Sequence, residues 1–191
     1  LKIPSSKIHL IPSHHLAHAY STFIPSGFEK VAVLIVDGLG SGLQGSSLYY
    51  AEGTKIEHIE SGYFFSVGML YEVVTRKILN FDVGEEGKTM GLAAFGAKYA
   101  EREKILNIQG KYNGMNVDYG EFMTRIPDNS FIKEFKKCKH KKDLYNQYFS
   151  IIAYEVQCEV EKAMLHFAEY AKRVTGANYL CIAGGVGLNC V

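Results

Sequence analysis

The sequence predicts an α/β fold in which helices flank a sheet. Two segments have the apolar character of buried strands, VAVLIVD (31–37) and YLCIAGG (179–185). A third segment, residues 144–174, repeats apolar side chains at three- and four-residue spacing, which is typical of an amphipathic helix. Such elements are expected to pack as layers around one core.

A short strand and a short helix are predicted near the start of the chain. KIHLIP (7–12) has the composition of a strand. Ser13 stands at the N-cap position of a helix formed by HHLAHAYSTF (14–23), and Pro25 and Gly27 are expected to end that helix.

A β-meander is predicted next. The buried run at 31–37 leads through a DGLGSG turn into two more strands, QGSSLYYAEG (44–53) and TKIEHIESGYF (54–64). Beyond them the sequence predicts a helix over 66–79, because its apolar residues return to helical spacing.

The middle of the chain is more varied. The segment GEEGKTMGLAAFG (84–96) is expected to place glycines around a short helical core, and residues 98–109 are expected to be helical. A hairpin or pair of short strands is predicted within 113–126, and the basic segment 131–143 is interpreted as a solvated helix end or loop.

The composition is that of an ordinary globular protein. The 191 residues are 47% hydrophobic and 21% charged, with a net charge of +1, which favours neither nucleic acid nor a membrane surface as a partner. No apolar run approaches the roughly 20 residues that span a bilayer, and the first residues lack the apolar core of a signal peptide. The cysteines are widely spaced and form no CxxC pair, so we expect reduced thiols in a cytoplasmic protein: Cys138, Cys158, Cys181 and Cys190.

Three histidines fall within five positions, at 14, 15 and 18. On a helix, His14 and His18 lie on one face one turn apart, a spacing that allows both imidazoles to bind one cation. The zincin motif HExxH has the same spacing, but His15 occupies the position of its glutamate, so a metalloprotease is not predicted. His15 points elsewhere and is a candidate to contact substrate. The alternative is a packed histidine pair bonded to the backbone.

Asp37 ends a buried strand and is followed by Gly38 and Gly40. Glycines let the backbone approach an anion, and a carboxylate holds a cation. With His14 and His18 it would complete a set of two histidines and one carboxylate, which suits Fe(II) and would also suit Zn or Mn. A plain Asp-Gly turn is the alternative.

Two glycine-rich segments are candidates for anion or nucleotide binding. Lys88 follows Gly87 at a predicted helix start, although the spacing is not that of a P-loop. The second segment, AGGVGLN (183–189), carries Gly184, Gly185 and Asn189 after a buried strand, where a nucleotide-binding turn would lie. Tight packing corners are the alternative in both places.

Four segments in this order resemble the NodU/CmcH family of O-carbamoyltransferases: HHLAHAYSTF, LIVDGLGSG, GEEGKTMGLAAFG and AGGVGLNCV. The family's usual forms are HHxxHA, DGxG, EGKxMGLAxYG and GGVALN. Here Phe95 stands where tyrosine is common, and Gly187 where alanine is common. The match runs from His14 to Val191.

The resemblance implies an incomplete Kae1-like domain of the actin-like ATPase (ASKHA) superfold, with a mixed sheet and flanking helices. Residues 1–191 would be part of that domain, with roughly 1–80 the remainder of its first half, and 81–191 a helical insertion and the start of its second half. The family's HDSSA-like turn is expected before residue 1, and a further Asp ligand and a YrdC-like domain are expected after residue 191. We therefore expect the isolated chain to be inactive.

The resemblance also implies a reaction: carbamoyl transfer from carbamoyl phosphate, through an ATP-derived carbamoyl-adenylate, to a hydroxyl of a sugar or natural product. Alternatives are a tRNA threonylcarbamoyl-transfer protein, a hydrogenase-maturation protein, or a non-catalytic nucleotide-binding module. By position, three groups of residues take roles: His14, His18 and Asp37 as ligands of Fe(II) or another divalent metal; Gly38, Gly40, Gly87, Lys88, Gly184, Gly185 and Asn189 in cofactor binding; and Lys88 and His15 as catalytic candidates, His15 as general base.

Overall fold

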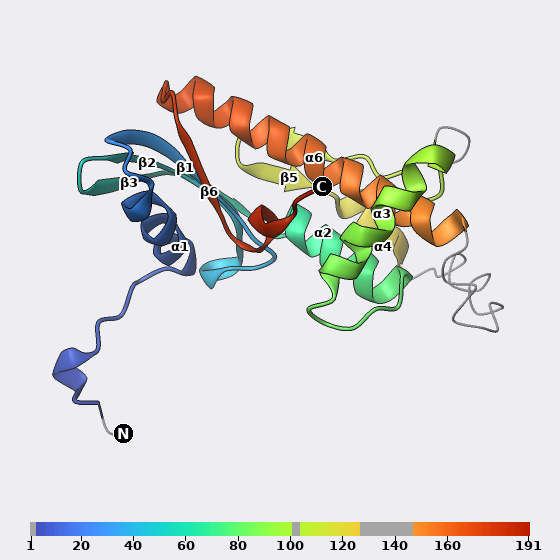
Figure 1. Cartoon of the computed structure of the whole chain (residues 1–191), viewed down its shortest axis with the longest axis horizontal. Helices are drawn as coiled ribbons and strands as arrows, with labels where there is room; N and C mark the ends of the chain where they lie inside the picture. Colours follow the sequence, from blue (N-terminus) through green and yellow to red (C-terminus); the bar gives the residue numbers. More distant parts are fainter. Residues whose placement is uncertain (1–2, 101–103, 127–146) are drawn as a thin grey trace.

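The computed structural model describes residues 3–100, 104–126 and 147–191. Its centre is a four-stranded sheet in the order β3-β2-β1-β6 (Figure 1). Neighbouring strands β1 and β2, and β2 and β3, run antiparallel, whereas β1 and β6 run parallel. The sheet is therefore mixed, and the predicted α/β class is confirmed. The strands are β1 (Lys30–Val36), β2 (Gln44–Glu52), β3 (Lys55–Tyr63) and β6 (Leu180–Ala183).

Helices cover both faces of this sheet (Figure 1). The short helix α1 lies on one face, and the long helix α6 lies on the other together with α2, whereas α3 packs against α6. A two-stranded hairpin, β4-β5, forms a second, separate sheet that packs against β2 and β3. The bounds are α1 (His14–Phe23), α2 (Val67–Val73) with a π-helical turn (Val74–Ile78), α3 (Glu86–Ala100), β4 (Lys111–Asn113), β5 (Asn116–Asp118), α4 (Gly120–Arg125) and α6 (Gln147–Thr175), with 3₁₀ turns at Ser5–Lys7, Ile24–Ser26, Ser41–Leu43 and Gly185–Leu188.

Strand β1 is buried on both faces because successive side chains alternate between two cores. Val33 and Ile35 pack with Ala19 and Phe23 of α1, whereas Leu34 joins the larger core under α6. The continuous apolar run of the sequence is thus explained by two-sided burial. This central strand delivers its last residue, Val36, to the edge where the candidate site begins.

The predicted strand over 7–12 is wrong. Ser5–Lys7 forms a 3₁₀ turn, residues 8–12 have no regular structure, and Ile8, Leu10 and Ile11 are exposed. A strand needs a neighbour to pair with its backbone groups. Within the described ranges, no strand pairs with this segment.

The predicted helix over 98–109 is also wrong for residues 104–109; α3 includes residues 98–100, and residues 101–103 lie outside the described residues. Residues 104–110 form no helix, because the carboxylate of Glu155 on α6 accepts hydrogen bonds from the backbone N–H groups of Ile105, Leu106 and Asn107 at 2.5, 2.8 and 3.1 Å. A tertiary acceptor thus binds the donors that a helix would use internally.

The remaining segments agree in part. The predicted hairpin is present as β4-β5, but it begins at Lys111, before the predicted range 113–126, and α4 follows it inside that range. A single helix, α3, replaces the short helical core expected within 84–96. The basic segment 131–143 and Cys138 lie outside the described residues. The three described cysteines are free thiols: Cys158, Cys181 and Cys190.

Strand pairing joins the two parts into which the chain is expected to divide near residue 80. Strand β6 comes from the second part of the chain, yet it pairs with β1 from the first part, Val33 opposite Cys181. Both parts therefore contribute to one sheet. No helix in the described ranges combines the length and apolar character needed to cross a membrane.

Candidate functional site

The two histidines at helical spacing face each other at the start of α1. Ser13 caps this helix, its hydroxyl accepting a hydrogen bond from the Leu16 backbone N–H at 3.3 Å. The cap begins the helix at His14, and one turn later His18 places its Nε2 atom 3.1 Å from His14 Nε2. The imidazole rings meet edge to face, with centroids 4.6 Å apart.

Asp37 follows the last residue of β1 and completes the cluster. Its Oδ2 atom lies 2.9 Å from His14 Nε2 and 3.5 Å from His18 Nε2. Its Oδ1 atom instead accepts hydrogen bonds from the backbone N–H groups of Gly38, at 2.8 Å, and Gly185, at 3.3 Å. Backbone amides thus orient the carboxylate so that one oxygen is presented to both histidines.

These three side chains fit a divalent metal ion. Their ligand atoms all lie within 4.8 Å of one another. Two ligands about 2.1 Å from one ion, at about a right angle, are roughly 3 Å apart, which is close to the separation of the two Nε2 atoms. Two imidazoles and one carboxylate form a ligand set suited to Fe(II), Zn or Mn.

The charge state of Asp37 also suits a cation. Burial alone would raise the pKa of this carboxyl. The hydrogen bonds from His14 and from the amides of Gly38 and Gly185 outweigh that effect, so the pKa lies below its usual value. Asp37 is therefore ionised at neutral pH.

A serine that the motifs did not single out holds the segment after Asp37. The hydroxyl of Ser66 lies 2.6 Å from the carbonyl oxygen of Gly38 and also caps α2 by accepting from the Met69 N–H at 3.0 Å. Gly68 packs so closely that a Cβ added to it would lie 2.6 Å from the Asp37 carbonyl oxygen. A serine at the start of the helix predicted over 66–79, where an N-cap residue is expected, is the signal that could have identified this contact.

His15 occupies a different environment from its neighbours. Its side chain is fully buried, and its Nδ1 atom lies 2.7 Å from the hydroxyl oxygen of Ser47. Its Nε2 atom is buried without a hydrogen-bond partner. Burial lowers the pKa of His15 to about 4, so the ring is neutral at pH 7. A ring enclosed in this way does not reach solvent or an acceptor hydroxyl.

The depressed pKa of His15 predicts acid sensitivity of the fold. The unfolded chain binds a proton on His15 below about pH 6.5, whereas the folded chain does not until about pH 4. Stability is thus fully present above pH 6.5 and is lost progressively as the pH falls toward 4. Between pH 7 and pH 5 the loss should be about 2 kcal/mol.

Urea denaturation at the two pH values tests this prediction. The variant His15→Asn has no titrating ring, so its loss of stability over the same interval should be smaller by about that amount. Equal losses in native protein and variant would contradict the prediction.

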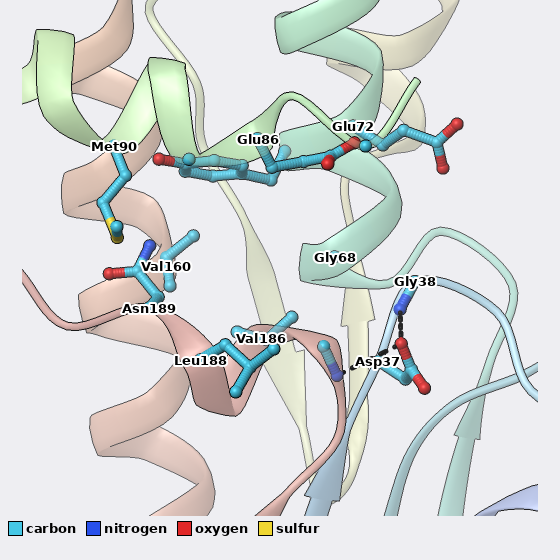
Figure 2. Close-up of a pocket in the computed structure, with 14 residues that line it drawn as sticks. Asp37, Gly38, Gly68, Glu72, Glu86, Met90, Val160, Val186, Leu188 and Asn189 are labelled. Atoms are coloured by element: carbon cyan, nitrogen blue, oxygen red, sulfur yellow. Dashed lines mark hydrogen bonds between the residues drawn. The ribbon is translucent and has the colours of Figure 1, made fainter. Parts of the chain in front are cut away.

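A cavity of about 490 Å³ adjoins the cluster, with Asp37 and Gly38 at one end and Met90 and Asn189 at the other (Figure 2). Two further carboxylates, Glu72 and Glu86, line it, and no lysine or arginine is among the described residues that do so. The lining residues are Asp37, Gly38, Gly68, Tyr71, Glu72, Gly84, Glu86, Gly87, Met90, Val160, Gly185, Val186, Leu188 and Asn189.

The amide of Asn189 is tied to helix α6. Its Nδ2 donates to Gln157 Oε1 at 2.8 Å, and Gln157 Nε2 donates to Asn189 Oδ1 at 2.9 Å. The Tyr71 hydroxyl donates to the same Gln157 oxygen at 3.2 Å. Gln157 is almost fully buried, and a glutamine beside the apolar residue Val156 in the pattern of 144–174 is the signal that could have singled it out.

Three of the residues predicted to bind a cofactor lie outside the cavity lining. Lys88 is exposed and pairs with Glu85, and its Nζ lies 5.7 Å from the centroid of the Phe81 ring. Gly40 packs against the ring of His15. Gly184 packs against the backbone of Val36. The structure thus brings the three candidate metal ligands together beside a cavity that both glycine-rich segments help to line, whereas Lys88 lies away from that cavity.

Comparison with known proteins gives consistent matches. The chain is 32% identical over 192 residues to the uncharacterized protein sll1178 of Synechocystis sp. (strain ATCC 27184 / PCC 6803 / Kazusa), covering 95% of this chain and 31% of that protein. It is 30% identical over 193 residues to nodulation protein NolNO of Sinorhizobium fredii (strain NBRC 101917 / NGR234), covering 99% and 27%. It is 29% identical over 179 residues to nodulation protein NolO of Bradyrhizobium diazoefficiens (strain JCM 10833 / BCRC 13528 / IAM 13628 / NBRC 14792 / USDA 110), covering 93% and 32%.

The chain thus spans about a third of the length of these curated relatives. The family model described as carbamoyltransferase N-terminus matches residues 2–191, which is nearly the whole sequence. The resemblance carried by the four motifs is therefore confirmed, and the chain belongs to the carbamoyltransferase N-terminus family.

Proposed function

We propose that this chain is the metal-binding part of an O-carbamoyltransferase. The enzyme would transfer a carbamoyl group from carbamoyl phosphate, through an ATP-derived carbamoyl-adenylate, to a hydroxyl of a sugar or natural product. The observation that carries the proposal is the convergence of His14, His18 and Asp37 beside a cavity, in a chain of this family.

The three side chains would hold Fe(II) or another divalent ion. When bound, the ion would polarise the carbamoyl carbonyl or orient the acceptor hydroxyl. Asp37 supplies the negative charge that favours a cation, and the amides of Gly38 and Gly185 keep its other oxygen out of the cluster. His14 and His18 supply neutral nitrogen donors.

The cavity would take the hydroxyl-rich part of a substrate. The carboxylates of Glu72 and Glu86 can accept hydrogen bonds from ribose or sugar hydroxyls, and they disfavour a bare phosphate. A nucleotide would therefore place its nucleoside here. Gly87, Gly185 and Asn189 also line the cavity and are the residues proposed to contact the nucleoside.

His15 would take no part in proton transfer, because its ring is enclosed. Lys88 would have to break its ion pair with Glu85 before it could offset negative charge on a departing phosphate or AMP, so no role is proposed for it here. The YrdC-like domain and the ASKHA fold remain proposals. The meander followed by a strand parallel to β1 is the strand pattern expected for one ASKHA half. Family membership favours O-carbamoyl transfer over a tRNA-modifying, hydrogenase-maturing or non-catalytic role.

The test uses the full-length natural protein, purified without oxygen. Its metal content is measured, the metal is removed with a chelator, and Fe(II) is added back. Carbamoyl-phosphate-dependent release of pyrophosphate from ATP reports adenylate formation without an acceptor. Radiolabelled carbamoyl phosphate then reports transfer to sugars and hydroxylated natural products.

We expect transfer to stop in the chelated protein and to return with Fe(II) or another divalent ion. Transfer at the native rate by metal-free protein would contradict the role of the cluster. Failure to release pyrophosphate would contradict the adenylate route.

A further inference from the structure

We propose that Ser47 is a positioning residue for the metal centre. By its hydrogen bond to His15, Ser47 would fix the position of α1 relative to the sheet. That position determines the distance between the histidine pair and Asp37. This inference rests on the proposed metal centre, and it concerns residues that touch neither the ion nor a substrate.

A chain of short hydrogen bonds connects the sheet to the helix. His15 Nδ1 lies 2.7 Å from Ser47 Oγ, which lies 2.7 Å from Ser61 Oγ, which in turn lies 2.7 Å from His58 Nε2. Gln44 Nε2 donates to Ser61 Oγ at 3.1 Å. The chain therefore links α1 to both β2 and β3.

The hydrogen bond between His15 and Ser47 is buried, so its loss would not be compensated by water. His15 and Ser47 have no exposed surface, and Ser61 is 6% exposed. The α1 side chains Ala19 and Phe23 pack on the same face of the sheet. In such a setting a polar group that loses its partner is strongly destabilising, so His15 is held at the one position where Ser47 satisfies its Nδ1 atom.

The location of this link matches the metal centre. His15 lies between His14 and His18 on the same helix. Ser47 pairs with Ile35 of β1, two residues before Asp37. The His15–Ser47 bond thus connects the element that carries two ligands to the strand beside the third.

His15 also contacts the loop after Asp37. A Cβ added to Gly40 would lie 2.6 Å from His15 Nε2, so the ring and this glycine are in close contact. An Nε2 with no partner is better left as a lone pair than as a buried N–H. This assigns the proton to Nδ1, which then donates to Ser47, which donates to Ser61, which donates to His58. Ser47 is the first acceptor in that series, and no other polar group is recorded at Nδ1 among the described residues.

The test replaces Ser47 with alanine in the full-length protein and titrates the metal-free form with Co(II) alone. Losing a partner bonded directly to a metal ligand costs about 10- to 100-fold in affinity, and Ser47 acts one residue further away, so we expect Co(II) affinity to fall by about 10-fold. The visible spectrum of bound Co(II), which reports ligand geometry, should also change.

Ser46→Ala is the matched control. Ser46 is the adjacent residue of β2, is also buried, and donates its hydroxyl hydrogen bond to the Met115 carbonyl oxygen at 2.5 Å, on the opposite face. This variant should lose similar stability but keep native Co(II) affinity. A second pair separates packing from hydrogen bonding: His15→Asn can retain a donor near the Nδ1 position and should bind Co(II) more tightly than His15→Leu.

Two results would overturn the inference alone: native affinity in Ser47→Ala, or an equal loss of affinity in Ser46→Ala and Ser47→Ala. Native protein that binds no Co(II) would overturn the metal centre itself, and the inference with it. Melting temperatures of all variants establish that the folded forms are compared.

Discussion

Replacing Asp37 with asparagine is expected to weaken metal binding by more than about 100-fold and to slow carbamoyl transfer by at least as much. Outer-shell losses alone cost about 10- to 100-fold, and Asp37 would be a direct ligand and the only anionic one in the cluster. Asparagine keeps an oxygen for the amides of Gly38 and Gly185 but removes the charge that faces His14 and His18. Metal content and transfer rate, measured on the full-length protein, check both effects.

The control for this variant is Glu57→Gln, which removes one negative charge from an exposed position on β3. It should leave metal content and rate unchanged. The fold of Asp37→Asn should also persist, because the backbone hydrogen bond from the Asp37 N–H to the Gly45 carbonyl, at 2.8 Å, does not involve the side chain. Native metal content in Asp37→Asn would refute the assignment of this carboxylate.

Replacing Gly184 with alanine should destabilise the protein by about 3 kcal/mol or more. Gly184 has φ 98° and ψ 167°, a backbone conformation that is essentially restricted to glycine. An added Cβ would also lie 2.3 Å from the Val36 carbonyl oxygen, which belongs to the central strand and cannot move aside. The next residue, Gly185, donates to Asp37, so the same change should displace that amide and weaken metal binding.

Gly91→Ala is the control for a glycine without such a constraint. Gly91 is exposed within α3, and an added Cβ would meet no atom within 4 Å. Alanine there should be neutral or stabilise the helix by up to about 1 kcal/mol. Chemical denaturation distinguishes the two variants, and a Gly184→Ala protein within 1 kcal/mol of native stability would show that the strand junction tolerates a side chain.

The central elements could be predicted from sequence because their residues carry a local signal. The run at 31–37 is apolar at every position until Asp37, and the structure buries its strand on both faces. Ser13 caps α1 at the position expected. The predicted helix over 98–109 failed because a residue distant in sequence determines the local structure. Glu155 accepts hydrogen bonds from the backbone amides of residues 105–107, so that segment is not a helix. The sequence of the segment itself contains no sign of this acceptor.

In the candidate site, too, the features that depend on local sequence could be predicted, and those that depend on distant residues could not. The spacing of His14 and His18 and the place of Asp37 at a strand end are local features, and the structure brings these three together. The burial of His15 depends on Ser47, 32 positions away, and the pairing of Asn189 depends on Gln157, also 32 positions away. The Lys88 side chain forms an ion pair with Glu85 and does not line the cavity. Glu85 is only three residues away, so its carboxylate is within reach of the lysine.

The hydrogen bond from Gly185 to Asp37 joins residues 148 positions apart and has a consequence for the order of folding. During synthesis, the chain must extend beyond Gly185 before the carboxylate can adopt its final orientation. Closing so long a loop carries an entropic cost that only a nearly complete fold offsets, and pairings of this range form slowly. The three candidate metal ligands would therefore be among the last features to assemble, and a metal ion would bind them only after this part of the chain has folded.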